Sequence, residues 1–369
     1  MNGLPSMIPG TLTRYFALRF LGATVGVFAS LFVIVAMADY LELMRRTSGA
    51  PNLSALLVAK VSLYRVPQVL ERLFAFTMLI GTMSCYLNLS RRLELVIARA
   101  AGLSAWQFLA PAIVVAFVIG VIGTAAYNPL AATLHERSKR LEVELLGERE
   151  TMFQSAGGDF WLRQRSVDGQ SVINAQTSRE QGLQLTGVIA FKYDANGHFS
   201  ERIEAKTAVL EPGYWRLAEA RVYAAGTPPV FHDSYLLNTN LTPTQVRESF
   251  ATPETVPFWQ LPAYIDLAER AGLGAAGYRL QYQKLIARPF TLAAMVMLAA
   301  AVSLRFFRFG GVQKMILGGL SAGFLLYVLA KVTEDLSKAE LMHPVVAAWL
   351  PVLVGGFTGL VALLYLEDG

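Results

Sequence analysis

Residues 16–37 read FALRFLGATVGVFASLFVIVAM, an apolar stretch whose only charged side chain is Arg19. About 20 predominantly apolar residues in a helix cross the roughly 30 Å hydrocarbon core of a bilayer, so this stretch predicts a membrane span. Five further stretches meet the same condition, and the six are arranged as three before and three after a long central region of ordinary polar sequence. The predicted spans cover residues 16–37, 69–89, 106–127, 285–306, 316–332 and 345–366.

The composition agrees with a chain that lies largely in lipid. Hydrophobic residues make up 54% of the sequence, charged residues 16%, and the mean hydropathy is +0.42. The first span is too long for a cleavable signal peptide and lacks a small-residue cleavage site, so we expect it to act as its own targeting signal. Lys and Arg beside the spans favour, by a modest excess, cytoplasmic termini and an extracytoplasmic central region.

The chain is basic, with a formal net charge of +5 and a pI near 9.3. Many of its basic residues lie at the borders of the predicted spans. Anionic lipid head groups or a negatively charged glycolipid explain such a distribution. We therefore expect no nucleic acid partner.

The central region reads as a series of short β-strands. Tight-turn signals, among them Asp194-Ala195-Asn196-Gly197 and Glu211-Pro212-Gly213, separate runs of alternating character. This spacing predicts a sandwich, a jelly roll or an open barrel, without an intrachain disulfide because Cys85 is the only cysteine. The predicted strands cover residues 160–163, 171–174, 185–193, 201–210, 214–223 and 234–237, and helices are expected at 131–149 and 261–272.

The expected fold class is therefore an α-helical polytopic membrane protein, three spans plus three, with an inserted extracytoplasmic all-β domain of jellyroll-like form. Residues 1–134 would hold the first three spans, residues 135–260 the β-domain, and residues 261–369 the last three spans.

No catalytic or metal-ligand spacing stands out. Residues 319–323 match the G-x-S-x-G pattern of a serine nucleophile, but that pattern needs a strand-to-helix turn and here lies inside the fifth span. No phosphate-binding P-loop sequence occurs, so any ATP hydrolysis must come from a separate chain. We expect a transporter subunit with no catalytic residue, metal or cofactor. The four histidines, which are scattered along the chain, are His135, His198, His232 and His343.

Pairs of glycines four residues apart predict close helix packing. They are Gly22 with Gly26, Gly319 with Gly323, and Gly355 with Gly359.

The loop between the second and third spans reads as a short helix. Residues 91–102 are RRLELVIARAAG, with an apolar stripe at Leu93, Val96, Ile97 and Ala100 and with Gly102 as the terminator. Ser104 and Gln107 then form a capping box for the third span. This helix could bind an ATPase, or it could lie at the membrane interface with arginines that merely follow the positive-inside rule.

Polar side chains follow one face of the helix that leads into the second span. Lys60, Tyr64, Gln68 and Glu71 are spaced to share that face. Ionisable groups near membrane depth usually face a cavity or a partner.

Several short motifs, in the order of the layout above, resemble the LptF/LptG (YjgP/YjgQ) family of lipopolysaccharide export permeases, and most of all its LptG-type member. The resemblance covers essentially the whole chain. Its motifs are Arg14-Tyr15, Arg92-Leu93-Glu94-Leu95-Val96 through Ala101-Gly102, Asn128-Pro129, Leu241-Thr242-Pro243 and Tyr278-Arg279-Leu280-Gln281-Tyr282.

The resemblance implies a permease subunit of an ATP-driven exporter in the inner membrane of a Gram-negative bacterium, with a periplasmic β-jellyroll. The implied partners are a cytoplasmic ABC ATPase dimer, a second, LptF-type permease, a single-span LptC-like accessory subunit, a periplasmic LptA-like bridge and the cargo lipopolysaccharide. Glu94 would contact the ATPase, supported by Arg91, Arg92 and Arg99. The first and fifth spans would border the gate through which lipid enters.

The same resemblance makes Arg45, Arg46, Lys60, Tyr64 and Gln68 the expected lipid contacts. Guanidinium groups suit lipid-A phosphates or sugar acids. The alternative for Arg46 is an i,i+4 pair with Glu42 at a solvated helix end, worth a few tenths of a kcal/mol. Some members of the family carry a basic residue where this chain has Asp39.

Two other function classes stay open. The chain could be a mechanotransmission permease that drives a periplasmic partner without moving lipid, or a membrane-anchored assembly scaffold. A homodimer also remains an alternative to the heterodimer that the resemblance implies.

Overall fold

The computed structural model of the chain describes residues 10–47, 55–155, 160–166, 169–179, 182–194, 198–224, 228–240, 253–270, 275–307 and 312–368. In these residues, six helical stretches are long and apolar enough to cross a membrane, and each predicted span lies within the helices that form one of them. The polytopic fold is thus confirmed. The spans are built from α1 (Gly10–Thr47), α2 (Ala55–Arg91), α4 (Ala105–Ile122) with α5 (Asn128–Ser155), α8 (Ala276–Phe307), α9 (Val312–Lys338) and α10 (Pro344–Asp368).

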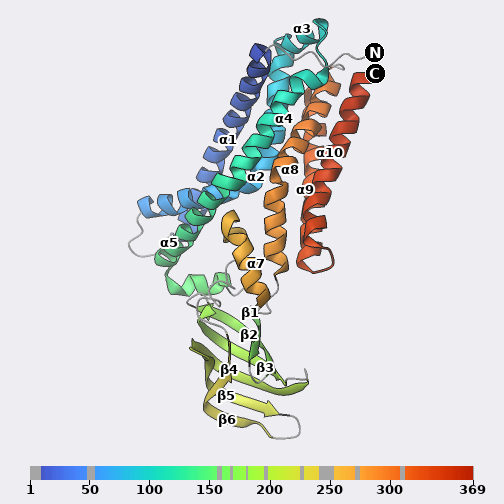
Figure 1. Cartoon of the computed structure of the whole chain (residues 1–369). Helices are drawn as coiled ribbons and strands as arrows, with labels where there is room; N and C mark the ends of the chain where they lie inside the picture. Colours follow the sequence, from blue (N-terminus) through green and yellow to red (C-terminus); the bar gives the residue numbers. More distant parts are fainter. Residues whose placement is uncertain are drawn as a thin grey trace.

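The spanning helices form one elongated bundle with a different structure at each end (Figure 1). The start of α1, the end of α10 and the short helix α3 (Glu94–Ala100) lie together at one end, called here the terminal end. The β-domain lies beyond the other end, called here the domain end. A π-helical turn, η1 (Gly123–Tyr127), joins α4 to α5, which continues out of the bundle toward the β-domain.

Glycines allow the helices of the bundle to pack closely. A Cβ on Gly120 of α4 would lie 2.4 Å from the Cα atom of Pro289 in α8. The packing predicted for two of the three glycine pairs is confirmed, because Gly319, Gly323, Gly355 and Gly359 all contact neighbouring helices. For the third pair it is wrong within the described chain, since no described atom lies within 4 Å of a Cβ built on Gly22 or Gly26.

In its described residues, the β-domain is one six-stranded antiparallel sheet in which each strand pairs with the next along the chain. All six predicted strands are confirmed, and each extends beyond its predicted bounds. The Glu211-Pro212-Gly213 turn links the fourth to the fifth, with Gly213 at a φ of 89°. The strands are β1 (Phe160–Ser166), β2 (Gly169–Arg179), β3 (Gln184–Tyr193), β4 (Phe199–Glu211), β5 (Tyr214–Ala224) and β6 (Val230–Asn238).

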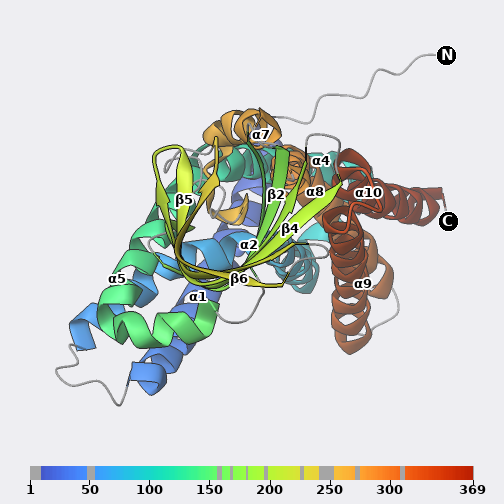
Figure 2. The ribbon, with the colours of Figure 1, turned by 90° about the horizontal axis from the view of Figure 1, so that it is seen from below.

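A line of irregular pairing crosses the middle of this sheet. Gly187 of β3 and Glu219 of β5 have φ values of 64° and 52°, and the regular pairing between neighbouring strands is interrupted beside both. In β4 the buried residues are two positions apart up to Ala205 and again from Ala208, so the strand exchanges its buried and exposed faces between these two residues. The pairing register is the same on both sides of these interruptions, and Figure 2 shows the sheet folded over rather than flat. One continuous sheet thereby encloses a core around Trp215, which is the jellyroll-like form expected.

A buried glutamine completes that core. Gln164 Oε1 accepts hydrogen bonds from Trp215 Nε1 at 3.2 Å and from Thr239 Oγ1 at 2.6 Å, while Gln164 Nε2 donates to Ser171 Oγ at 2.9 Å. Because buried polar groups cost free energy unless they are paired, this network lets Trp215 lie fully inside the sheet.

Two flanking segments connect the sheet to the bundle. The helix predicted at 131–149 is confirmed within α5. The helix predicted at 261–272 is confirmed as α7 (Leu261–Arg270), while its last two residues lie outside the described chain. Before α7, residues 253–260 contain the short helical turns η3 (Pro253–Thr255) and η4 (Phe258–Gln260) and are called here the return segment.

Candidate functional site

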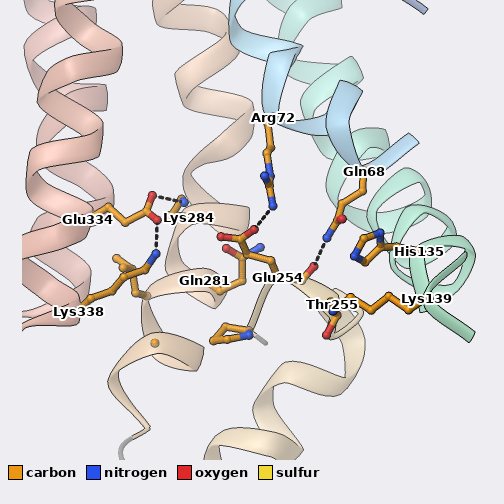
Figure 3. Close-up of a pocket in the computed structure, with 13 residues that line it drawn as sticks. Gln68, Arg72, His135, Lys139, Glu254, Thr255, Gln281, Lys284, Glu334 and Lys338 are labelled. Carbon is orange, nitrogen blue, oxygen red and sulfur yellow. Dashed lines mark hydrogen bonds and ion pairs between the residues drawn. The ribbon is translucent and has the colours of Figure 1, made fainter. Parts of the chain in front are cut away.

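A polar cavity of about 310 Å³ lies at the domain end of the bundle. Figure 3 shows that α2, α5, α8, α9 and the return segment all contribute side chains to it. The cavity therefore lies where the spans meet the connection to the β-domain. Its charged and polar lining side chains are Gln68, Arg72, His135, Lys139, Glu254, Thr255, Gln281, Lys284, Glu334 and Lys338.

The return segment closes one side of the cavity through Glu254. The Glu254 carboxylate forms an ion pair with Arg72 of α2, and the Glu254 backbone oxygen accepts a hydrogen bond of 3.3 Å from Gln68 Nε2 (Figure 3). Two side chains one helical turn apart on α2 thus hold a residue that lies more than 180 positions later in the sequence.

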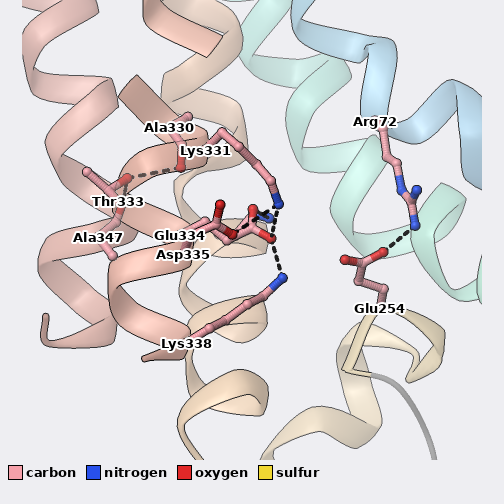
Figure 4. Close-up of polar contacts among 10 residues, drawn as sticks. Arg72, Glu254, Ala330, Lys331, Thr333, Glu334, Asp335, Lys338 and Ala347 are labelled. Carbon is pink, nitrogen blue, oxygen red and sulfur yellow. Dashed lines mark hydrogen bonds and ion pairs between the residues drawn. The ribbon is translucent and has the colours of Figure 1, made fainter. Parts of the chain in front are cut away.

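The opposite side of the cavity is built around Glu334 of α9. Its carboxylate accepts hydrogen bonds from Lys284 Nζ at 2.7 Å (Figure 3) and from Lys338 Nζ at 2.6 Å, and Lys331 Nζ lies 3.5 Å away (Figure 4). Asp335 pairs with Lys331 at 3.2 Å. The Glu334 side chain is only 13% exposed, so removing its cationic partners would leave a costly unpaired charge.

The lining of the cavity is electropositive. Four of its side chains are cationic and two are carboxylates, counting His135 as neutral. Among the described residues, His135 Nδ1 has no hydrogen-bond partner. Cationic and amide groups around a cavity suit an anionic group of a ligand. No set of three or more possible metal ligands occurs in the described ranges.

The structure brings only one of the five predicted lipid contacts into this cavity, namely Gln68. Arg45 Nε and Arg46 Nε both donate to the carboxylate of Glu42, at 3.1 and 2.8 Å, which is the alternative arrangement expected for a helix end. Lys60 Nζ lies 5.8 Å from the ring centroid of Tyr64. The polar face predicted for α2 therefore does not line a single cavity.

Several cavity residues had no signal in the sequence. Glu334 and Lys338 are spaced four residues apart, as in helical ion pairs, but the contact of Glu334 with Lys284 joins positions 50 residues apart. Glu254 and Lys139 belong to no motif. Only the packing of α2, α5, α8 and α9 brings these groups together.

The second candidate site is α3 at the terminal end, which the sequence predicted as a helix. The predicted capping box between Ser104 and Gln107 is confirmed. Leu93, Val96 and Ile97 are 58%, 46% and 66% exposed, so most of the predicted apolar stripe faces outward. This surface is open to a partner or to the membrane interface.

The charged residues of this site differ in their contacts. Tyr15 Oη donates a hydrogen bond of 2.7 Å to Glu94 Oε2, and Arg19 of α1 lies 4.0 Å from the other carboxylate oxygen. Arg91 and Arg92 are exposed. The Arg99 guanidinium lies 6.0 Å from the ring centroid of Phe108.

A cavity of about 250 Å³ lies beside this site, between α1 and α2. Arg19, Arg92 and Glu94 line its polar part. Glu94 is thus held by α1 while it borders an open space.

Together, the spans, the inserted sheet and the electropositive cavity define a polytopic membrane protein whose bundle meets a β-domain at a polar site. Residues 14–365 match the family described as "Lipopolysaccharide export system permease LptF/LptG". The chain therefore belongs to the LptF/LptG family of lipopolysaccharide export permeases, and it is a multi-pass inner membrane protein.

Similar proteins include two from well-known bacteria. The lipopolysaccharide export system permease protein LptG of Escherichia coli K12 is 22% identical over 348 residues, which cover 90% of this chain and 93% of that protein. The protein of the same description from Haemophilus influenzae is 23% identical over 361 residues, covering 93% and 95%.

Proposed function

We propose that the chain is a permease subunit of an ATP-driven exporter that extracts lipopolysaccharide from the inner membrane and passes it to a periplasmic bridge. The observation that carries this proposal is the electropositive cavity at the domain end, lined by Arg72, Lys139, Lys284 and Lys338. Lipopolysaccharide is an amphiphile with anionic phosphates and sugar acids, and cationic side chains beside an apolar bundle suit such a molecule.

In this proposal the terminal end faces the cytoplasm and the domain end faces the periplasm. Residues 1–134 and 261–369 form the transmembrane part, and residues 135–260 form the periplasmic domain. The exposed apolar side chains of α3, with Glu94, Arg91, Arg92 and Arg99, then bind a cytoplasmic ABC ATPase dimer. A second, LptF-type permease completes the membrane unit. A single-span LptC-like subunit and a periplasmic LptA-like bridge then receive the lipopolysaccharide.

Arg45 and Arg46 remain proposed lipid contacts at the domain end of α1. Their bonds to Glu42 leave the Arg45 side chain 79% exposed, so its outer face can meet a phosphate. Replacing both arginines with alanine should weaken crosslinking of glycolipid to this segment. Undiminished crosslinking would remove them from the site.

Co-purification from the native membrane tests the function as a whole. Proteins and retained lipids would be identified by mass spectrometry. Recovery of an ATPase, a second six-span permease and lipopolysaccharide would support the export proposal. An ATPase without glycolipid would favour a mechanotransmission permease, and neither would favour an assembly scaffold.

A further inference from the structure

The Asn128-Pro129 motif lies at a junction where three helices meet. The π-helical turn η1 comes directly before Asn128, and wide turns of this kind leave backbone carbonyls open to other donors. Gly123 O accepts from Arg288 Nη1 at 3.2 Å, and Ala125 O accepts from Trp259 Nε1 at 2.9 Å. The turn therefore binds α8 on one side and the return segment on the other.

A buried ion pair lies beside this turn. Arg288 Nη2 of α8 is 2.6 Å from Glu71 Oε1 of α2, and the two side chains are only 15% and 8% exposed. The Arg288 guanidinium also lies 5.8 Å from the ring centroid of Phe74. A carboxylate buried to this extent needs several donors.

Asn128 supplies one of those donors. Its Nδ2 atom donates a hydrogen bond of 2.7 Å to Glu71 Oε1, and its Oδ1 atom accepts one of 2.9 Å from the backbone N–H of Phe258. The carboxylate requires a donor and the N–H requires an acceptor, so chemistry fixes the orientation of the amide. Asn128 is 1% exposed, and water cannot replace either bond without opening the junction.

The junction joins both connections of the β-domain to α2. Asn128 begins α5, which leads into the sheet, while Phe258 belongs to the return segment, which leads out of it. Gln68 and Arg72, on either side of Glu71 along α2, hold Glu254 of the same return segment. Phe258 also stacks on Tyr282 of α8, with ring planes 13° apart.

We propose that Asn128 is a positioning residue that fixes both connections of the β-domain to α2 through Glu71. The β-domain then moves as one body with the domain end of α2. About 20 residues further along, α2 ends next to α3, a helical distance of roughly 30 Å. On the proposed function, displacement of α3 by an ATPase is passed along α2 to the β-domain by this link.

Spin-label distance measurements on the full chain in nanodiscs test the link without nucleotide, ATPase or lipid cargo. In a Cys85→Ala background, one label replaces Val230 in β6 and the other replaces Leu63 in α2, two positions that are 51% and 52% exposed. We expect a narrow distance distribution for the parent and a broadened one for Asn128→Asp, which places a second carboxylate against Glu71. Asn88→Asp, an exposed asparagine on α2, is the matched control and should stay narrow.

A charge exchange keeps the test decisive if Asn128→Asp does not fold. Combining Asn128→Asp with Glu71→Gln keeps one carboxylate in the junction with Arg288. The new amide at position 71 can then donate a hydrogen bond to the new carboxylate at position 128. This double variant should recover the narrow distribution. A narrow distribution in Asn128→Asp, or a double variant as broad as the single one or unable to fold, overturns the proposal. Because no cargo is present, this outcome is independent of whether lipopolysaccharide co-purifies.

Discussion

The hydroxyl of Tyr15 in α1 donates a hydrogen bond of 2.7 Å to Oε2 of Glu94, which is the first residue of α3. The same hydroxyl accepts a hydrogen bond of 2.9 Å from Arg19 Nε. These contacts join the helix of the first span to the short helix after the second, 79 residues apart. Displacement of α3 away from α1 must therefore break a charge-assisted hydrogen bond.

Removing the Tyr15 hydroxyl should loosen α3. A hydrogen bond to a charged group contributes about 1.5–3 kcal/mol, and less where water competes for it. Tyr15→Phe is therefore expected to speed hydrogen exchange of the backbone amides in Glu94–Ala100, measured by mass spectrometry. Tyr365→Phe is the control, because Tyr365 is 84% exposed on α10. Unchanged exchange in Tyr15→Phe would show that the contact does not restrain α3.

Glu94→Ala should reduce the amount of ATPase that co-purifies with the chain. The proposed function makes this carboxylate a contact of the ATPase, whereas Tyr15→Phe removes only a competing partner and should leave ATPase binding intact or increased. Asp233→Ala, an exposed carboxylate in β6 of the β-domain, is the matched control. Equal ATPase recovery in all three variants would exclude Glu94 as a docking residue.

The cations of the domain-end cavity should determine how much anionic glycolipid is retained. Lys139→Gln combined with Lys338→Gln removes two positive charges from the lining and leaves Lys284 beside Glu334. Retention should fall, and its dependence on salt should weaken, because partly exposed charges are screened by ions. Lys206→Gln, a 67% exposed lysine in the β-domain, is the control. Glycolipid retention equal to that of the control would contradict a role for this cavity.

Hydropathy and turn chemistry were enough to predict the helices and strands of this fold. A span of 20 apolar residues has few alternatives in lipid, and Gly213 marks a turn because it adopts a positive φ. The position of the bend in the sheet was not predicted. At Glu219 a non-glycine residue adopts a left-handed conformation, which only the pairing of its neighbours reveals.

The sites were less predictable because they depend on contacts between distant segments. The periodicity of Lys60, Tyr64, Gln68 and Glu71 indicated one polar face, yet Gln68 lines a cavity while Glu71 is buried against Arg288. The resemblance predicted Glu94 as a contact residue, which stays a prediction, and nothing in the sequence indicated that Tyr15 would be its hydrogen-bond partner. Local spacing shows which side chains share a helix face, and it does not show which helix covers that face.

The glycines of α4 and α1 should respond in opposite ways to the same substitution. Gly120→Ala would place a methyl group 2.4 Å from the Cα atom of Pro289, a backbone atom that cannot rotate away, so α4 and α8 must separate. We expect a loss of about 1–3 kcal/mol. Gly22→Ala meets no described atom within 4 Å and should leave stability unchanged or raise it by up to about 1 kcal/mol, since alanine favours helix over glycine.

Thermal unfolding of the isolated chain in detergent, followed by intrinsic tryptophan fluorescence, measures both variants under one condition. The midpoint should fall for Gly120→Ala and hold or rise for Gly22→Ala. If Gly22→Ala lowered the midpoint as much as Gly120→Ala, the face of α1 that carries Gly22 and Gly26 would have to be packed within the single chain. If Gly22→Ala instead holds or raises the midpoint, no other helix of the monomer packs against that face of α1.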